Sequence, residues 1–344
     1  MEKKANIIDV ARYLGVATST VSRALKDHPS ISAKTKKLVF NAVRELNYSP
    51  NKIAANLRSG NGTAIGVIIP KINSNFMSNC IFGIENVIYP SGYNLIICQS
   101  TEHYEKELSN VKTLIDSQVS GILISVSNET VSTGHLAMVK ANNIPLIMFD
   151  RITESLQVDC IVNDDTRGAY EAIEHLIEQG YSKIALLNGP EHIYVYKNRY
   201  QGYKQALASN NLDLQPDWII QNINTQSNAY QATCLLLDSK HPPDAIFCAS
   251  DTLALGVLEA LKQRNIQSPE QIGVVGYGND IYGDLTTPTL TSVEQFPQEI
   301  GASAAQIMLQ ILEDKNVKSI PKTISIRPRL IVRRSSSRKV KPSI

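Results

Sequence analysis

Short apolar runs alternate with helical patterns along most of the chain, from about residue 64 to residue 330. The runs have the length of buried strands, and the segments between them show helical periodicity. The first set of predicted strands is Ala64–Ile69, Asn94–Cys98, Gly121–Ser125 and Leu146–Phe149. The second set is Lys183–Leu187, Ala245–Ala249 and Gly273–Tyr277. This alternation is typical of parallel sheets covered by helices, and two sets indicate two α/β lobes.

The first 48 residues show a different pattern, that of a small helical domain. Gly15 can adopt the positive φ at which one helix ends and another begins at a steep angle. A second helix is predicted from about Thr18 to Leu25, and Ser32 is the predicted N-cap of a third. The predicted core between the first two helices is Val10, Leu14, Val16, Val21 and Leu25. The apolar stripe of the third helix is Leu38, Val39, Ala42, Val43 and Leu46.

Short polar residues begin the predicted second helix, and an arginine follows them. Small side chains let the start of a helix approach the major groove of DNA, and an arginine can donate two hydrogen bonds to guanine. The alternative is an ordinary helical hairpin with a polar face. The predicted DNA contacts are Thr18, Ser19, Thr20, Ser22 and Arg23.

Residues 49–62 are predicted to be a hinge. Pro50 breaks the preceding helix, and Gly60 and Gly62 mark a linker. Between them, Asn51 to Ser59 could form a helix that is too short to be stable alone in water. We therefore expect this segment to become ordered only against DNA or a partner.

Charge is unevenly distributed along the chain. Residues 1–60 hold 11 basic and 4 acidic side chains, a balance of +7, and residues 327–344 hold 7 basic and no acidic ones. Residues 61–326 hold 16 basic and 28 acidic side chains, a balance of −12, so the sum is +2. A basic head on an acidic body favours binding of a polyanion such as nucleic acid. A solvated basic surface is the alternative, and we expect residues 335–344 to be a disordered tail.

Composition narrows the functional class. With 43% hydrophobic and 19% charged residues among 344, the chain is typical of a globular protein and not of a disordered or fibrous one. No apolar run reaches the length of a membrane helix, and the polar N-terminus predicts no signal peptide. Five cysteines without a CxxC pair predict reduced thiols in a cytoplasmic protein. The sequence has no P-loop, GxSxG or HExxH motif, so we predict neither an enzyme nor a cofactor or metal site.

Polar side chains follow several predicted strands of the body. Open α/β sheets bind ligands beyond the carboxyl ends of their strands. Carboxylates, an arginine and an aromatic ring suit a polyhydroxylated ligand, because they fix its hydroxyl groups and cover its apolar face. Helix capping or a surface ion pair is the alternative for each residue. The candidate effector-binding residues are Phe76, Asp150, Arg199, Asp251 and Asn279.

The segments DVARYLGVATSTVSRAL and YSPNKIAANLRSG closely resemble the lac repressor/GalR family of bacterial transcription regulators. The resemblance continues in order through EHLIEQGYSKIALLNGP, PDAIFCASDTLALGVLEAL and IGVVGYGND. It implies a three-helix, lambda-repressor-like helix-turn-helix head over residues 1–48. It also implies a periplasmic-binding-protein-like body over residues 63–334, built of two Rossmann-like lobes. The chain is expected to cross between the lobes near residues 162–164, 291–293 and 320–325.

These crossings divide the body into discontinuous lobes. The first is expected to hold about residues 63–162 and 293–322. The second is expected to hold residues 163–292 and 323–334.

The resemblance also implies a mechanism. Two chains form a homodimer that binds a near-palindromic double-stranded operator, most often as a repressor, and a small carbohydrate-like effector closes the cleft between the lobes. Asp150 and Arg199 match positions that many members use for the effector. The hinge helices are expected to enter the minor groove, with Leu57 as the apolar wedge. The predicted hinge contacts are Asn51, Lys52, Ala54, Leu57 and Arg58.

Two departures from the family pattern concern binding. Gly278 stands where the family often has an acid, and Ala17 stands where a serine usually caps the recognition helix. The competing interpretation is a solute-binding protein of a sugar importer. The helix-turn-helix head and the lack of a signal peptide count against it.

Overall fold

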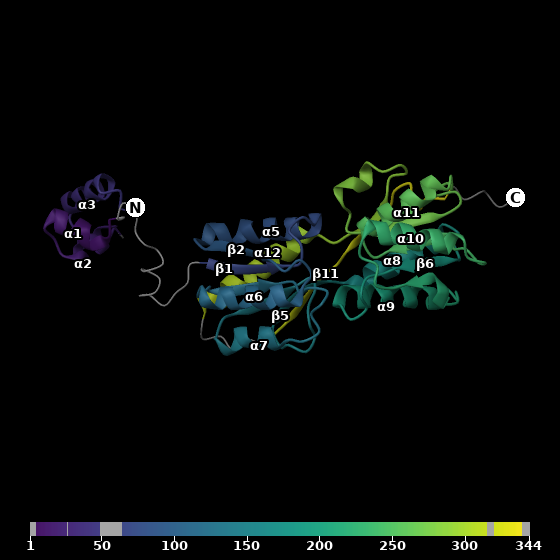
Figure 1. Cartoon of the computed structure of the whole chain (residues 1–344), viewed down its shortest axis with the longest axis horizontal. Coiled ribbons are helices and arrows are strands. Elements are labelled where there is room, and N and C mark those ends of the chain that lie inside the picture. Colours follow the sequence, from purple (N-terminus) through teal and green to yellow (C-terminus); the bar gives the residue numbers. More distant parts are fainter. Residues whose placement is uncertain (1–4, 26, 49–63, 315–319, 339–344) are drawn as a thin grey trace. The chain divides into compact units, whose positions relative to one another are not determined.

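The computed structural model describes residues 5–25, 27–48, 64–314 and 320–338 (Figure 1). The chain divides into two compact units, Met1–Gly62 and Thr63–Ile344, called here the head and the body. The predicted hinge residues Asn51, Lys52, Ala54, Leu57 and Arg58 lie outside the described residues. Within the described part, no helix is both long enough and apolar enough to cross a membrane.

Residues 5–48 of the head, as far as they are described, contain the helices α1 (Ile7–Leu14), α2 (Thr18–Leu25) and α3 (Ala33–Glu45). Gly15 ends α1 with a φ of 64°, as its sequence position predicted. The Ser32 hydroxyl caps α3 by accepting from the Thr35 amide at 3.2 Å. The fully buried centre of the core is Val10, Val21, Ala24 and Val39. Leu38, predicted to belong to the apolar stripe of α3, is instead exposed.

The first lobe of the body is a parallel sheet with the strand order β11-β5-β4-β3-β1-β2. Its strands are β1 (Ala64–Ile69), β2 (Asn94–Gln99), β3 (Gly121–Ile124), β4 (Leu146–Phe149), β5 (Asp159–Asn163) and β11 (Thr323–Ile326). The helices are α5 (Asn75–Ile88), α6 (Tyr104–Asp116), α7 (Gly134–Ala141) and α12 (Pro297–Glu313). Helices α5 and α12 pack on one face of the sheet, and α6 and α7 pack on the other.

The second lobe repeats this architecture with the strand order β12-β10-β9-β8-β6-β7. Its strands are β6 (Ile184–Leu187), β7 (Ile219–Ile220), β8 (Ala245–Cys248), β9 (Gly273–Tyr277), β10 (Thr291–Glu294) and β12 (Arg329–Ile331). The helices are α8 (Asp165–Glu178), α9 (Tyr194–Ser209), α10 (Gln226–Leu237) and α11 (Asp251–Gln263). The antiparallel partner of β10 is β12, and the other pairings of this sheet are parallel. Both lobes are thus sheets covered by helices, as the sequence predicted; the first sheet is parallel, and the second is parallel except for its edge strand β12.

The chain passes between the lobes after β5, after β10 and between β11 and β12. The third passage lies later than the predicted 320–325. Residues 323–326 pair with β5 in the first lobe, so the prediction that they belong to the second lobe is wrong. The strand β11 is a short edge strand with mostly exposed side chains, so it lacks the apolar pattern of a buried strand.

Close helix packing fixes the shape of the first lobe. A Cβ atom at Gly83 of α5 would overlap the carbonyl oxygen of Gln298, and one at Gly301 of α12 would overlap that of Cys80. The two glycines therefore let α5 and α12 approach each other closely. The start of α5, which carries Phe76, is held in place by this contact.

The prediction of a disordered tail is wrong for residues 335–338. The side chain of Ser336 is buried and shares hydrogen bonds with His175 at 2.7 Å and Thr291 at 2.7 Å. The guanidinium of Arg338 lies 4.5 Å from the centre of the Tyr181 ring. A polar run can be buried when each hydroxyl group finds a partner, and composition alone does not reveal such partners. Residues 339–344 lie outside the described part.

Candidate functional site

A cavity of about 330 Å³ lies between the two lobes of the body. It is lined by residues that follow β1 and β4 in the first lobe and β6, β8 and β9 in the second. The charged side chains in its lining are Lys71, Glu102, Asp150, Arg151, Arg199 and Asp280. Three are basic and three are acidic, so their formal charges cancel.

Asp150 is the buried carboxylate on the first-lobe side of the cavity. It follows β4 in a left-handed conformation with a φ of 60°, and its side chain accepts from the Ser125 hydroxyl at 3.1 Å. Burial raises the pKa of Asp150 to about 6, although the guanidinium groups of Arg151 and Arg199 oppose the rise. The strained backbone and the buried charge are both features that collect at functional sites.

Replacing Asp150 by asparagine should change how stability depends on pH. The folded-state pKa lies above the unfolded value of about 4, so the folded state holds the proton more firmly. The resulting stabilisation is complete below pH about 4 and is lost as the pH rises through about 6. In urea unfolding, wild type should lose about 2–3 kcal/mol relative to Asp150→Asn between these limits. A difference that stays constant with pH would contradict a titrating Asp150.

Arg199 is the buried cation on the second-lobe side. Its Nε donates to Asp165 Oδ1 at 2.8 Å, and Nη1 donates to the Ala249 carbonyl oxygen at 2.6 Å. The guanidinium also lies 3.8 Å from the centre of the Tyr277 ring. Since Arg199 and Asp165 are almost fully buried, each needs the other to offset the cost of leaving water.

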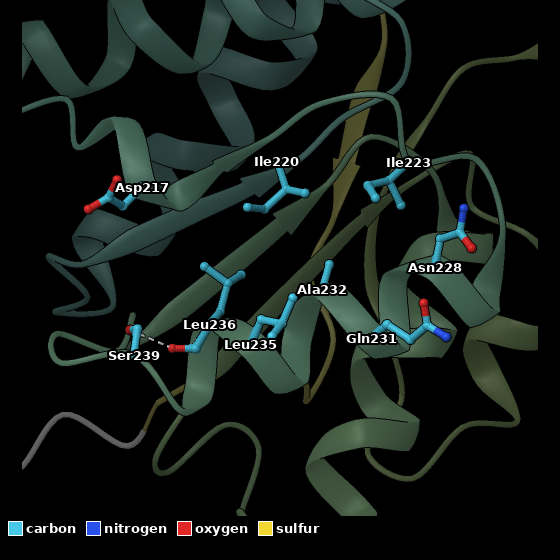
Figure 2. Close-up of a pocket in the computed structure, with 9 residues that line it drawn as sticks. All are labelled: Asp217, Ile220, Ile223, Asn228, Gln231, Ala232, Leu235, Leu236 and Ser239. Carbon is cyan, nitrogen blue, oxygen red and sulfur yellow. Dashed lines mark hydrogen bonds between the residues drawn. The ribbon is translucent and has the colours of Figure 1, made fainter.

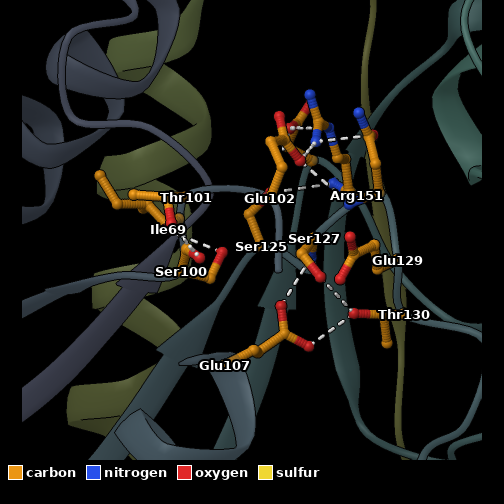
Figure 3. Close-up of polar contacts among 12 residues, drawn as sticks. Ile69, Ser100, Thr101, Glu102, Glu107, Ser125, Ser127, Glu129, Thr130 and Arg151 are labelled. Atoms are coloured by element: carbon orange, nitrogen blue, oxygen red, sulfur yellow. Dashed lines mark hydrogen bonds and ion pairs between the residues drawn. The ribbon is translucent and has the colours of Figure 1, made fainter. Parts of the chain in front are cut away.

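A polar network fixes Arg151 on the first-lobe side (Figure 3). Its Nη1 donates to Glu102 Oε2 at 2.8 Å and to Asn128 Oδ1 at 3.0 Å. Below this network, the fully buried Glu107 accepts from the Ser127 amide at 2.6 Å and the Thr130 hydroxyl at 2.7 Å. Glu107 thereby anchors the loop that presents Asn128.

Direct polar contacts also join the two lobes around the cavity. Asn75 Nδ2 donates to Asp280 Oδ1 at 2.9 Å. Elsewhere, His192 Nε2 contacts the Asn128 carbonyl oxygen at 2.7 Å. These two contacts join described residues of the first lobe directly to described residues of the second.

The lining includes some of the candidate residues and not others. Phe76, Asp150 and Arg199 line the cavity. Asp251 and Asn279 are not among the lining residues. Instead, Asp251 accepts from the Asp280 amide at 2.6 Å and the Ser292 hydroxyl at 2.6 Å, so it shapes the loop after β9.

The side-chain amide of Asn279 is also engaged in hydrogen bonds within the protein. Its Nδ2 donates to Glu294 at 2.7 Å, and its Oδ1 accepts from Arg333 at 2.9 Å. Arg151 and Asp280, which adjoin Asp150 and Asn279 at the predicted strand ends, also line the cavity. The lining residues that sequence reasoning missed include Glu102, Asn128 and Tyr196, which come from loops or from within a helix.

A second groove, of about 420 Å³, lies on the second lobe alone between β7 and α10 (Figure 2). Its floor is apolar and includes Ile220, Ala232 and Leu236. Among the residues that the structure describes, its lining holds one charged side chain, Asp217, and comes from the second lobe. The cavity between the lobes, with its converging polar groups, is therefore the candidate effector site.

The head presents α2 as the candidate DNA-binding element. Val21 and Ala24 face the core, whereas Thr18, Ser19 and Arg23 are exposed. Thr20 and Ser22 are half-buried. The exposed residues are those that the sequence analysis placed nearest the base edges, but their contacts with DNA remain a prediction.

Comparison with known proteins assigns both parts of the chain. Residues 6–51 match the family described as bacterial regulatory proteins, lacI family, and residues 173–336 match a periplasmic binding protein-like domain. The transcriptional repressor PurR of Vibrio campbellii is 32% identical over 96% of this chain and 98% of its own length. The chain belongs to the lacI family. This membership confirms the predicted family, the fold class and the general function, a ligand-responsive DNA-binding transcription regulator.

Solved structures agree with the assignment. The lac repressor dimer bound to operator and an anti-inducer is 26% identical, with a TM-score of 0.85, over 97% of this chain and 99% of that one. A lacI-family regulator from Enterococcus faecium with bound ribose is 28% identical, with a TM-score of 0.70, over 80% and 99%. The PurR relatives are transcriptional repressors, and the match over residues 6–51 disfavours an importer's solute-binding protein.

Proposed function

We propose that this regulator is a cytoplasmic, homodimeric repressor controlled by an uncharged, hydroxyl-rich effector that binds between the lobes. The main support for this class of effector is that the formal charges of the cavity lining sum to zero. Arg151 is already paired with Glu102, and Arg199 is paired with Asp165. The site therefore offers directional hydrogen bonds without a surplus of positive charge for a phosphate or carboxylate.

The aromatic lining supports a carbohydrate-like ligand. Phe76 and Tyr282 line the cavity alongside the carboxylates of Asp150 and Asp280. A ring covers the apolar face of a sugar, while carboxylates accept hydrogen bonds from its hydroxyl groups. The ribose bound to the E. faecium relative is of the same chemical class.

Exposed apolar side chains support a homodimer. On the first lobe, they lie on α5 and the edge strand β2 and include Phe82, Ile96 and Ile97. On the second lobe, Ile281 and Leu285 are 66% and 80% exposed. Contiguous exposed apolar surface marks interaction sites. The dimeric lac repressor relative is consistent with a second copy as the partner.

For DNA recognition, we propose that each head places α2 in a major groove and that the predicted hinge residues meet the minor groove. Two heads on one dimer would read a near-palindromic operator, because dimer symmetry is mirrored in the site. A coupling of about 1–3 kcal/mol between effector and operator binding would change operator affinity roughly 5–150-fold.

A thermal-shift screen tests the effector class. Neutral sugars and nucleosides should be compared with their phosphorylated counterparts, using wild type and Asp150→Asn. A neutral ligand at about 100 times its Kd should stabilise wild type by about 2.7 kcal/mol. Asp150→Asn should lose the shift and still bind operator. Stabilisation by the phosphorylated ligands alone would contradict the proposal.

A further inference from the structure

Tyr196 lies near two guanidinium groups that belong to different lobes, the partly buried Arg151 and the buried Arg199. It sits in the first turn of α9, lines the cavity, and has Arg151 and Arg199 each at 5.8 Å from its ring centre. Arg199 follows one turn later on the same helix, so its distance to the ring does not depend on the separation of the lobes. Arg151 follows β4 in the first lobe, so its distance to the ring changes when the lobes move relative to each other.

The second lobe holds the Tyr196 ring firmly. A Cβ atom at Gly189 would overlap the ring, so this glycine leaves the space in which the ring lies. The fully buried Asn188 donates from Nδ2 to the Tyr196 carbonyl oxygen at 3.1 Å and to Gln221 at 3.0 Å. The ring is thus fixed with respect to the sheet of its own lobe.

The first lobe holds Arg151 through hydrogen bonds of its own. Glu102 and Asn128 accept from its Nη1, and the buried Glu107 anchors the loop that carries Asn128. The guanidinium and the ring are each held by contacts within their own lobe, so a movement of the lobes apart would separate them.

We propose that Tyr196 is a positioning residue that couples closure of the lobes to the effector cavity through its contact with Arg151. This inference rests on the proposed function, because closure matters only if the cavity holds the effector. The attraction between a cation and an aromatic face stabilises the closed arrangement, and the ring, not the hydroxyl, supplies it. Tyr196 would then determine the separation of the lobes in the closed arrangement, and this separation would limit which ligands the cavity can enclose.

Closure can be measured without effector or DNA by cross-linking across the lobes. Lys197 Nζ and Glu154 Oε2 are 2.7 Å apart on opposite lobes, and both side chains are largely exposed. The full-length protein carrying Lys197→Cys and Glu154→Cys should react intramolecularly with a short bis-maleimide. Protein with native cysteines only gives the background for the partly buried Cys98 and Cys234.

Tyr196→Leu in this background should slow the cross-linking about two- to fivefold, as loss of a cation–π contact predicts, while Tyr196→Phe should keep the wild-type rate. Arg151→Gln should slow it equally, and the double variant should be no slower than either single one. If Arg151→Gln folds poorly, the comparison of Tyr196→Leu with Tyr196→Phe still tests the proposal.

An unchanged rate in Tyr196→Leu, equal loss in Tyr196→Phe, or additive effects in the double variant would overturn the proposal. Any of these results would leave the effector class untouched, since that class depends on the thermal-shift screen. Conversely, a screen in which no neutral ligand stabilises the protein would remove the effector proposal and leave the measured coupling intact.

Discussion

Arg199→Met should destabilise the body by about 3–5 kcal/mol, because it leaves a buried carboxylate without its partner. Asp165 is 1% exposed and accepts from Arg199 at 2.8 Å. Methionine keeps much of the side-chain volume, so loss of the charge pair outweighs the effect of a cavity. Urea unfolding of the two proteins at neutral pH measures the difference.

The matched control is Arg264→Met. Arg264 also pairs with an aspartate, Asp238, but both side chains are substantially exposed. Exposed pairs contribute little net stability because water screens the two charges, so this variant should remain close to wild type. Adding Asp165→Asn to Arg199→Met should recover part of the lost stability, because the uncompensated charge is removed. Equal effects of the two methionine variants would show that Arg199 does not compensate a buried charge.

Arg23→Ala should weaken operator binding by about 1–3 kcal/mol and relax the preference at one base position. The side chain is exposed on α2, on the surface away from the buried Val21 and Ala24. A guanidinium that donates to a base edge contributes sequence preference, which a phosphate contact does not. Competition between operator variants that differ at single positions measures both effects.

Arg12→Ala is the control for the loss of one positive charge from the head. Arg12 lies on α1 of the same head and is also exposed, so its replacement removes the same charge. It should weaken binding by a similar factor for all sequences and leave base preferences unchanged. If Arg23→Ala behaved in the same way, Arg23 would be a phosphate contact and its predicted role would be wrong.

Strong periodic patterns made most of the fold predictable. The helix α2 and the strands β1, β4 and β9 have the predicted bounds, since each is an uninterrupted apolar or amphipathic segment. The strands β5, β7, β10, β11 and β12 were not predicted as such. The strand β7 has two residues, and β11 and β12 are edge strands, so pairing with a distant segment defines them more than local pattern does.

The candidate site was partly predictable for a similar reason. Asp150 follows a clear strand, and Arg199 was identified by the family resemblance. Glu102 reaches the cavity because Thr101 and Glu102 both adopt positive φ, with values of 52° and 66°. Such a turn in residues other than glycine has no local signature. Asp251 also follows a strand, but its carboxylate accepts hydrogen bonds that support a loop, and it is not among the lining residues of the cavity.

If the head binds a symmetric operator under the control of a ligand-sensing body, the full-length protein should select particular duplexes from a fully randomised library. The selection is performed with and without the ligand found in the thermal-shift screen. We expect enrichment of a near-palindromic sequence, with recovery that changes roughly 5–150-fold when the ligand is added. Recovery of random duplexes without any dyad-symmetric preference, in both conditions, would contradict this expectation.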